Sequence, residues 1–204
     1  QSLKFSNTNV SDLTPLQGMK LSSLSCYSTK ISDLSPLRGM KLTRLNCAIN
    51  KVSDLTPLQG LPLVKLTLSA NPVSDLTPLA GMPLTDLHID NSEVADLSPL
   101  ANAPLTWLNI RETKVRDISS LRSARLVFLN AAKCAISDIS ALANSPLNEG
   151  LDLANTGVAD IDALRNKRMA FLILRSTPVA NVSPLFGAQI TRLDLAESKV
   201  TEIG

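Results

Sequence analysis

The chain has 204 residues, of which 44% are hydrophobic but only 3% are aromatic. It contains 36 leucines against four Phe, one Trp and one Tyr, although rings normally supply much of the buried area of a core. The 20 Lys and Arg nearly balance the 18 Asp and Glu, which excludes the strongly basic surface that nucleic acid or an anionic membrane requires. No apolar run approaches the roughly 18 residues of a membrane span, and residues 1–10 show no signal-peptide pattern.

One short segment recurs along the whole chain. The sequence VSDLTPL of residues 10–16 returns as ISDLSPL at residues 31–37. Equivalent segments follow at intervals of 21 residues, with a single interval of 22 between Ile136 and Val158, and they begin at Val52, Val73, Val94, Val115, Ile136, Val158, Val179 and Val200. The sequence therefore predicts that residues 1–204 form one array of about ten units.

Each unit combines a strand pattern with a turn pattern. Leu66 and Leu68 alternate with polar residues, which predicts a strand with one buried face. Thr77, Pro78 and Gly81 then match an N-cap, a first helical position and a left-handed stop around a single helical turn. We expect the same roles in the other units, with caps at Thr14, Ser35, Thr56, Ser98, Ser119, Ser140, Asp162 and Ser183 and stops at Gly18, Gly39, Gly60, Asn102, Ser123, Asn144, Asn166 and Gly187.

The pattern LxxLxLxx(N/T/C)x(V/I), followed by a leucine-bearing turn, resembles the leucine-rich repeat over essentially the entire chain. The (V/I)SDL(S/T)PL half is most similar to the bacterial internalin-like and SDS22-like subclass, although those units usually run one residue longer. The residues Cys26 to Thr29 and Gly39-Met40 also resemble arrays attached to serine/threonine kinases of planctomycete-type bacteria. The resemblance implies an α/β repeat: a right-handed solenoid with a parallel β-sheet on the concave face and short helical turns on the convex face. It also implies a scaffold that binds proteins, and not a catalyst.

Two polar columns have structural explanations. An asparagine-like slot, which includes Asn71 and Thr113, is expected to bond the backbone of the corner. An aspartate column has two interpretations, either a calcium track or acceptors for backbone N–H groups at the turn. The second is favoured because Asn181 fills the same slot and is a poorer calcium ligand. The column consists of Asp12, Asp33, Asp54, Asp75, Asp96, Asp117, Asp138 and Asp160, followed by Asn181 and Glu202.

The cysteines also follow the repeat. Cys26 and Cys47 take inward slots on adjacent strands, and Cys134 takes the asparagine-like slot, so buried thiols are expected. No CxxC pair or histidine cluster accompanies them, so we expect no metal and no cofactor.

The outward strand positions carry four of the six aromatic residues: Tyr27, Trp107, Phe128 and Phe171. Trp107 and Phe128 fall in one column on adjacent strands, so their rings should lie about 5 Å apart. Phe171 lies two strands beyond Phe128, with Gly150 leaving a gap, and the group is bordered by Arg111, Ile173 and Arg175. Exposed aromatics edged by Arg are typical of interface hot spots. The alternative is that a parallel strand simply tolerates these rings, which then cover one another or meet a crystal neighbour or a neighbouring domain.

His88 is the only histidine, and it is flanked by Asp86 and Asp90, with Ser69 on the preceding strand. A Ser-His-Asp arrangement can be drawn, but alternate strand residues lie about 7 Å apart and no glycine-rich loop offers an oxyanion hole. We expect a pH-sensitive contact instead and no catalytic residue. The acidic group Asp86, Asp90 and Glu93 lies beside a basic group, Lys30, Arg44, Lys51 and Lys65, which suggests charge-guided orientation of a partner.

The interval of 22 residues and the two ends of the chain depart from the regular repeat. One residue too many precedes Gly150, which predicts a bulge or a neutral insertion in the strand. The sequence begins within a strand and stops inside a unit without a polar cap. We therefore expect either a segment of a longer polypeptide, with covalently linked neighbouring domains, or an array that is capped by neighbouring chains. The leading hypothesis is a scaffold that holds a protein or peptide on its concave face. The alternative is a sensory or docking arm of a larger enzyme, such as a bacterial serine/threonine protein kinase.

Overall fold

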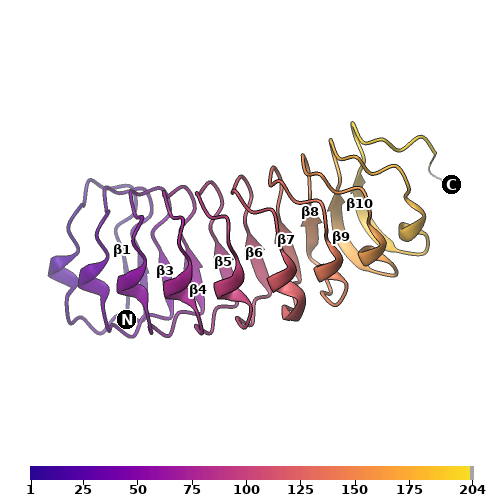
Figure 1. The fold of residues 1–204 in the computed structure, drawn as a ribbon. Helices are drawn as coiled ribbons and strands as arrows, with labels where there is room; N and C mark the ends of the chain where they lie inside the picture. Colours follow the sequence, from indigo (N-terminus) through magenta and orange to yellow (C-terminus); the bar gives the residue numbers. More distant parts are fainter. Residues whose placement is uncertain (203–204) are drawn as a thin grey trace.

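Ten parallel strands form one open sheet in the computed structural model, which describes residues 1–202 (Figure 1). Positions 203 and 204 of the predicted array lie outside the described residues. The strand order follows the sequence without interruption. The strands are β1 (Ser2–Lys4), β2 (Ser23–Ser25), β3 (Arg44–Asn46), β4 (Lys65–Thr67), β5 (Asp86–His88), β6 (Trp107–Asn109), β7 (Phe128–Asn130), β8 (Gly150–Asp152), β9 (Arg168–Ile173) and β10 (Gln189–Asp194).

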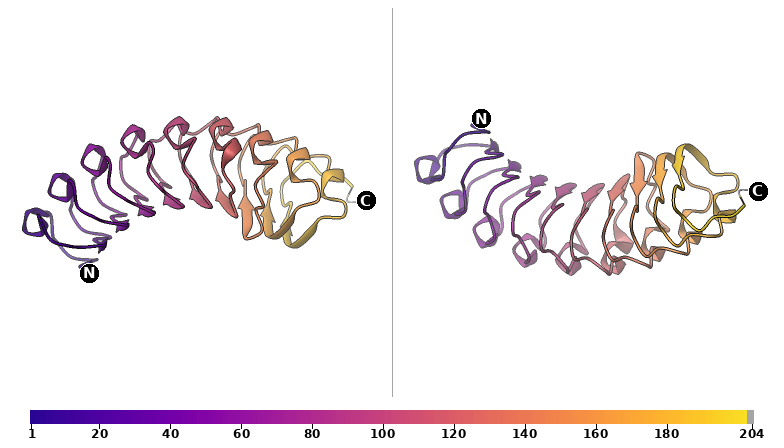
Figure 2. Two further views of the ribbon diagram at one scale, coloured as in Figure 1. Left: turned by 90° about the horizontal axis from the view of Figure 1, so that it is seen from below. Right: turned by 90° about the horizontal axis from the view of Figure 1, so that it is seen from above.

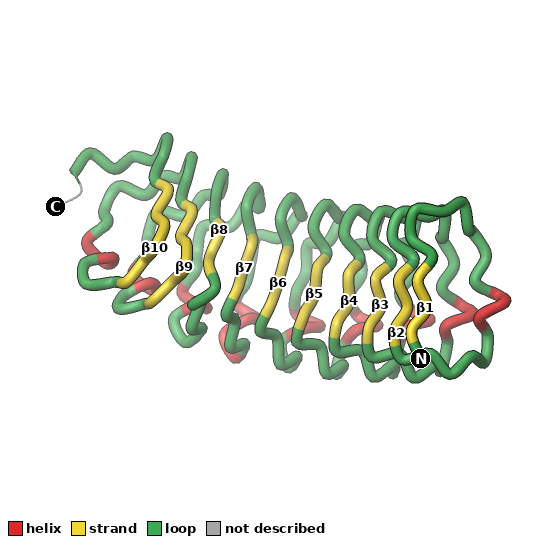
Figure 3. Tube along the Cα trace, turned by 180° about the vertical axis from the view of Figure 1, so that it is seen from behind, coloured by secondary structure: helices red, strands yellow, loops and turns green. Residues whose placement is uncertain are grey.

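A short 3-10 turn separates each strand from the next, and Figure 2 shows these turns on the outer side of an arc whose inner side is the sheet. Figure 3 shows the strands side by side from the other direction. The predicted solenoid, with a concave parallel sheet and convex helical turns, is therefore confirmed. The turns are η1 (Thr14–Leu16), η2 (Ser35–Leu37), η3 (Thr56–Leu58), η4 (Thr77–Leu79), η5 (Ser98–Leu100), η6 (Ser119–Ser123), η7 (Ser140–Leu142), η8 (Asp162–Leu164) and η9 (Ser183–Leu185).

The core is a stack of equivalent branched side chains. Leu66, Leu87 and Leu108 pair in register on consecutive strands, and all three are fully buried. The second inward column continues the pattern with fully buried Leu68 and Ile89. Each side chain packs on the same side chain of the next unit, so the column favours one shape and leaves little room for a ring. This packing explains the excess of leucine.

The asparagine-like slot bonds the corner backbone, as predicted. The Asn71 Nδ2 group donates to the carbonyls of Cys47 and Leu68, both at 2.9 Å, while Asn71 Oδ1 accepts the Val52 N–H at 2.9 Å. In another unit the Thr113 hydroxyl donates to the Ile110 carbonyl at 2.7 Å. These bonds satisfy backbone groups that the tight corner would otherwise leave unpaired.

The helical turns are not capped as predicted. The predicted Ser and Thr caps are the first residues of the 3-10 turns, and no side chain bonds from the N-cap position, which is Leu97 in η5. The aspartate column takes this role: Asp96 Oδ1 accepts the Ser98 N–H at 2.7 Å, and the Ser98 hydroxyl donates to Asp96 Oδ2 at 2.7 Å. Asn181 Oδ1 accepts the Ser183 N–H in the same way at 2.9 Å. The structural interpretation of the aspartate column is confirmed by these bonds.

The predicted stop residues are of two kinds. Gly18 has φ +77° after Gln17 at φ −57° and ψ 127°, which is a type II turn that needs a residue tolerant of positive φ. Asn102 instead follows Ala101 at φ −54° and ψ −29°, which is type I geometry that needs no positive φ. The left-handed prediction therefore holds for Gly18, Gly39, Gly60, Gly81, Asn166 and Gly187 and is wrong for Asn102, Ser123 and Asn144.

Candidate interaction face

Three aromatic side chains lie in mutual contact on the outward face of the sheet. Trp107 and Phe128 pair in register on β6 and β7, and their rings stack with centroids 4.6 Å apart and planes inclined by 19°. Phe128 meets Phe171 edge to face at 6.1 Å and 70°. Both geometries are favourable for aromatic pairs. The structure thus confirms the predicted Trp107–Phe128 contact and extends it to a cluster of three rings, which we call the aromatic cluster.

Gly150 allows Phe171 to join the aromatic cluster. The sequence predicted a gap at this position, but a Cβ atom placed on Gly150 would lie 2.4 Å from Cε1 of Phe171. The ring therefore leans over the glycine and fills the space between β7 and β9. A larger residue than glycine would displace the ring. The prediction of a gap is therefore wrong, because the Phe171 ring fills the space that a side chain at position 150 would take.

The extra residue of the long unit forms a bulge before β8, as predicted. The Leu147 N–H donates to the Leu126 carbonyl and the Glu149 N–H to the Val127 carbonyl, both at 2.9 Å, so the three residues 147–149 oppose only two of the preceding unit. Gly150 has φ +148°, which few side chains tolerate. β8 pairs with β9 only from Leu151 onward.

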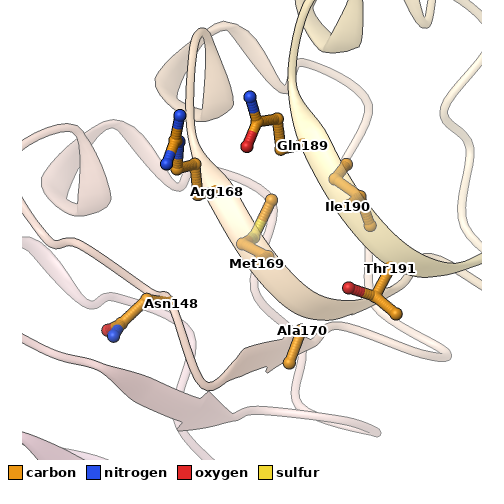
Figure 4. Close-up of a pocket in the computed structure, with 7 residues that line it drawn as sticks. All are labelled: Asn148, Arg168, Met169, Ala170, Gln189, Ile190 and Thr191. Carbon is orange, nitrogen blue, oxygen red and sulfur yellow. The ribbon is translucent and has the colours of Figure 1, made fainter.

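The longer strands β9 and β10 continue past the bulge and line an open hollow of about 460 Å³ at the edge of the sheet. Figure 4 shows polar and apolar side chains along its rim, from both strands and from the bulge. The lining residues are Asn148, Arg168, Met169, Ala170, Gln189, Ile190 and Thr191.

The rings of the aromatic cluster are half-buried, and not fully exposed as the sequence suggested. Stacking covers part of each ring, and the role of the rings in binding a partner stays a prediction. Ring area still remains open on the concave side. The large apolar residues with the highest exposure lie elsewhere, at Phe186 (60%), Ile49 (47%), Leu193 (43%) and Met19 (41%).

The two arginines predicted to border the aromatic cluster are engaged in ion pairs. Arg111 Nη2 lies 3.1 Å from Glu112 Oε1, and Arg175 Nε lies 3.3 Å from Asp194 Oδ2. Ile173 is half-buried on β9, in register with an aspartate on each neighbouring strand. The charge of both arginines is therefore offset by carboxylates of the same chain. The part of Arg111, Ile173 and Arg175 in binding a partner stays a prediction.

His88 and Ser69 do not form the Ser-His-Asp arrangement that was considered from the sequence. The His88 Nε2 atom lies 2.9 Å from Asp86 Oδ1, whereas the Ser69 hydroxyl donates to Asp90 Oδ1 at 2.6 Å. Asp90 also accepts a hydrogen bond from Asn109 at 2.8 Å. The serine and the histidine are thus held by different carboxylates, and the predicted His88 contact with an acidic neighbour is present.

The acidic and basic groups predicted from the sequence differ in how they are paired. Lys65 Nζ lies 2.9 Å from Asp86 Oδ2, and Glu93 binds Lys114 at 2.5 Å. Lys30, Arg44 and Lys51 form no ion pair within residues 1–202. Most of the acidic group is therefore neutralised by ion pairs within the chain, whereas most of the basic group is not. Tyr27 lies on this basic side, directly after β2 and far from the aromatic cluster on β6, β7 and β9.

Sequence reasoning missed a corner that follows each strand. One residue per unit has positive φ there, namely Asn7, Ser28, Ile49, Ala70, Asn91, Glu112, Lys133, Asn155, Ser176 and Glu197. Asparagine occurs three times in this column, and its tolerance of the left-handed region is the signal that could have revealed the corner. Ile49, at φ +52°, is the β-branched exception.

None of the helical turns within residues 1–202 has the length and apolar character that a membrane span requires. No group of three or more His, Cys, Asp or Glu side chains in this part of the chain is placed to hold a metal ion. The three cysteines are free and buried.

No protein-family model matches the sequence, and no curated protein matches it. Solved structures do match. The internalin InlF of Listeria monocytogenes superimposes with a TM-score of 0.92 at 29% identity, over 99% of this chain and 62% of InlF. The internalin InlC2 of the same species gives 0.69 at 27% identity, over 93% of this chain and 79% of InlC2. The plant peptide hormone receptor RGFR1, in complex with RGF2, shares the fold at 0.70 and 18% identity, over 97% of this chain and 40% of the receptor. This chain thus spans less than two thirds of InlF. The repeat pattern, the open ten-stranded sheet and the similarity to the two internalins show that the chain is a leucine-rich-repeat protein that is similar to the bacterial internalins.

Proposed function

We propose that this chain is a binding scaffold that holds a protein or peptide on its concave sheet, with the aromatic cluster at the centre of the contact. The observation that carries this proposal is the continuous contact of Trp107, Phe128 and Phe171 on an open face. Three of the six aromatic side chains lie on the side away from the core, where they contribute little to folding stability.

Physical reasons support a binding role for these rings. Stacking fixes their rotamers before a partner arrives, so less side-chain entropy is lost on association. Trp is enriched in hot spots because it buries a large apolar area at the centre of an interface. The fold serves a peptide hormone receptor in the plant complex, and proteins of the internalin group share the repeat.

The test is affinity capture from the native source with wild-type protein and a Trp107→Ala/Phe128→Ala double variant. We expect a partner that the wild type retains to be at least about tenfold depleted on the double variant, since hot-spot truncations cost 2 kcal/mol or more. Loss of the stacked pair, worth about 0.5–1.5 kcal/mol, should lower the melting temperature by only a few degrees.

Phe186→Ala is the matched control, because Phe186 is an exposed aromatic on the turn side of the array. This variant should retain the partner. Equal capture by the wild type and the double variant would contradict the proposal, and a collapse of the melting temperature in the double variant would mean that the rings are structural.

A docking or sensory arm of a larger enzyme, such as a bacterial serine/threonine kinase, is the alternative. The feature that favours it is the sequence from Cys26 to Thr29 and at Gly39-Met40. The two proposals differ in what is joined to the array. Kinase motifs in the flanking reading frame would support the alternative, and their absence there would reject it.

We also propose that the array is not itself an enzyme. Ser69 and His88 bind different carboxylates, so they do not form a Ser-His-Asp arrangement. A purified array that cleaves ester or peptide substrates, with loss of activity in Ser69→Ala, would overturn this proposal.

A further inference from the structure

Ile49 occupies a backbone position that is unfavourable for its side chain. Its φ is +52°, in the left-handed region where Cβ crowds the following carbonyl, and β-branching adds to the crowding. The side chain is also 47% exposed, so burial in the core does not offset this strain. Asparagine fills the same corner at Asn7, Asn91 and Asn155. The fold alone therefore gives no reason for isoleucine here.

The surroundings of Ile49 are basic. Residues 1–65 contain eight Lys and Arg but only three Asp, and these three belong to the aspartate column on the turn side. Lys51 follows Ile49 by two residues, and Lys30 takes the same position in the preceding unit. Both are exposed and lack an ion pair within residues 1–202.

Two comparable cations in the middle units are neutralised within the chain. Lys114, which has the same place in its unit as Lys51, binds Glu93, and Lys133 binds Glu112. Lys199 also has this place and forms no ion pair within residues 1–202, but the acidic residues Asp194 and Glu197 are close to it in the sequence. The positive field near Ile49 therefore comes from the excess of cations in residues 1–65, and not from the repeat pattern itself. Exposed cations of this kind favour a negatively charged partner.

Backbone contacts bring these residues to one edge of the sheet. The Ser28 N–H donates to the Ala48 carbonyl at 2.9 Å, which joins the corner that follows Tyr27 to the corner that contains Ile49. Tyr27 is half-buried there and keeps part of its ring open. We call Tyr27, Lys30, Ile49 and Lys51 the basic corner.

We propose that the basic corner binds an acidic peptide segment of the partner, with Ile49 and Tyr27 contacting an apolar side chain and Lys30 and Lys51 contacting carboxylates. This inference rests on the proposed scaffold function and assigns a partner chemistry to a second contact, remote from the aromatic cluster. A peptide fits better than a nucleic acid because the exposed strained residue is aliphatic, and an aliphatic side chain has little to offer a phosphate backbone.

The test uses three labelled synthetic peptides of equal length, built from alternating Glu and Leu, Lys and Leu, or Glu and Ser, with fluorescence anisotropy as the readout. The Glu/Leu peptide should bind at least about tenfold more tightly than the other two, and its affinity should fall as salt is raised from about 0.05 to 0.5 M. Ile49→Asn and Lys30→Glu/Lys51→Glu should each weaken this binding about tenfold.

Ile49→Asn should also raise the melting temperature, because asparagine tolerates the corner, so weaker binding could not be attributed to unfolding. Lys199→Glu makes half of the charge change of Lys30→Glu/Lys51→Glu, at an exposed lysine at the other end of the array, and should leave binding unchanged. Equal binding of all three peptides, or an unaffected Ile49→Asn variant, would overturn the inference. Tighter binding of a single-stranded oligonucleotide of equal charge would overturn it in favour of nucleic acid. The Trp107→Ala/Phe128→Ala variant should bind the Glu/Leu peptide normally, so failure here leaves the aromatic-cluster proposal intact.

Discussion

The hydroxyl of Ser92 is a buried polar group that lacks a hydrogen-bond partner within residues 1–202. Threonine in the same slot donates to the carbonyl three residues earlier, as Thr113 and Thr177 do at 2.7 and 2.6 Å. An unsatisfied buried hydroxyl costs stability, and a net hydrogen bond contributes about 0.5–1.5 kcal/mol. We therefore expect Ser92→Thr to increase the free energy of unfolding by about 1 kcal/mol, measured by urea titration.

The reverse substitution provides the control for this prediction. Thr113→Ser removes a buried methyl group and should lower the free energy of unfolding by roughly 0.8 kcal/mol. A Ser92→Thr variant no more stable than the wild type would show that the Ser92 hydroxyl is already satisfied in solution.

Side-chain direction could be predicted from the sequence wherever the repeat alone determines it. The column that contains Trp107 and Phe128 follows from counting, and their contact follows from the spacing of strands. The position of Phe171 could not be obtained in this way. It depends on the missing Cβ of Gly150 and on a bulge that changes the pairing of two strands. The strain at Ile49 depends on a backbone angle that its own residue type disfavours.

At the scale of the secondary-structure elements, the convex turns depend on ionised aspartates. The pKa of Asp96 lies below its usual value because the carboxylate accepts hydrogen bonds, first from the Ser98 backbone N–H and then from the Ser98 hydroxyl. Hydrogen bonds from the residue two positions on likewise lower the pKa of the carboxyls of Asp12, Asp33, Asp54, Asp75 and Asp138. These carboxylates therefore bind protons less readily in the folded chain than in the unfolded chain.

Acid should destabilise the array through this column. A group whose folded pKa is depressed contributes stability that is fully present above its unfolded pKa, here near 3.8, and that is lost as pH falls through the lower folded pKa. We expect the melting temperature to be steady above about pH 5 and to fall between about pH 4 and pH 2. Thermal unfolding followed by circular dichroism across this range tests the prediction.

Asp96→Asn separates this effect from general acid unfolding. The amide oxygen can keep the hydrogen bond to the turn, as Asn181 does toward Ser183, but it cannot be protonated in this range. The variant should show a shallower loss of stability with falling pH than the wild type. Parallel pH profiles for the two proteins would mean that other groups control acid unfolding.

The sequence predicted where the turns lie but not how they begin. A Ser or Thr before Pro matches an α-helical N-cap, whereas the turn is a 3-10 element in which that residue is already the first member. The aspartate two residues earlier then has the better geometry for accepting its N–H. The ends of the turns were predictable only where glycine or asparagine follows an extended residue, as at Gly18 and Asn166, because the φ and ψ of the preceding residue decide between type II and type I.

At the scale of the whole molecule, every contact between described elements joins neighbouring units. Each strand packs against the strands before and after it, and each convex turn packs against the adjacent turns. Stability in such an array is approximately a sum of terms for each unit and for each interface between neighbours. A local defect should therefore be felt locally and not shared equally by all ten strands.

Leu108→Ala tests this property. Leu108 is fully buried on β6 and lies in register with Leu87 and Leu129, so its truncation should lower the free energy of unfolding by about 2–5 kcal/mol. Hydrogen exchange should show the largest loss of protection in β5, β6 and β7, with β2 and β3 changing least, because few interfaces transmit the defect that far. The equivalent truncation Leu45→Ala on β3 should move the maximum toward the first units. A uniform loss of protection along the chain in both variants would instead mean that the solenoid unfolds as one cooperative body.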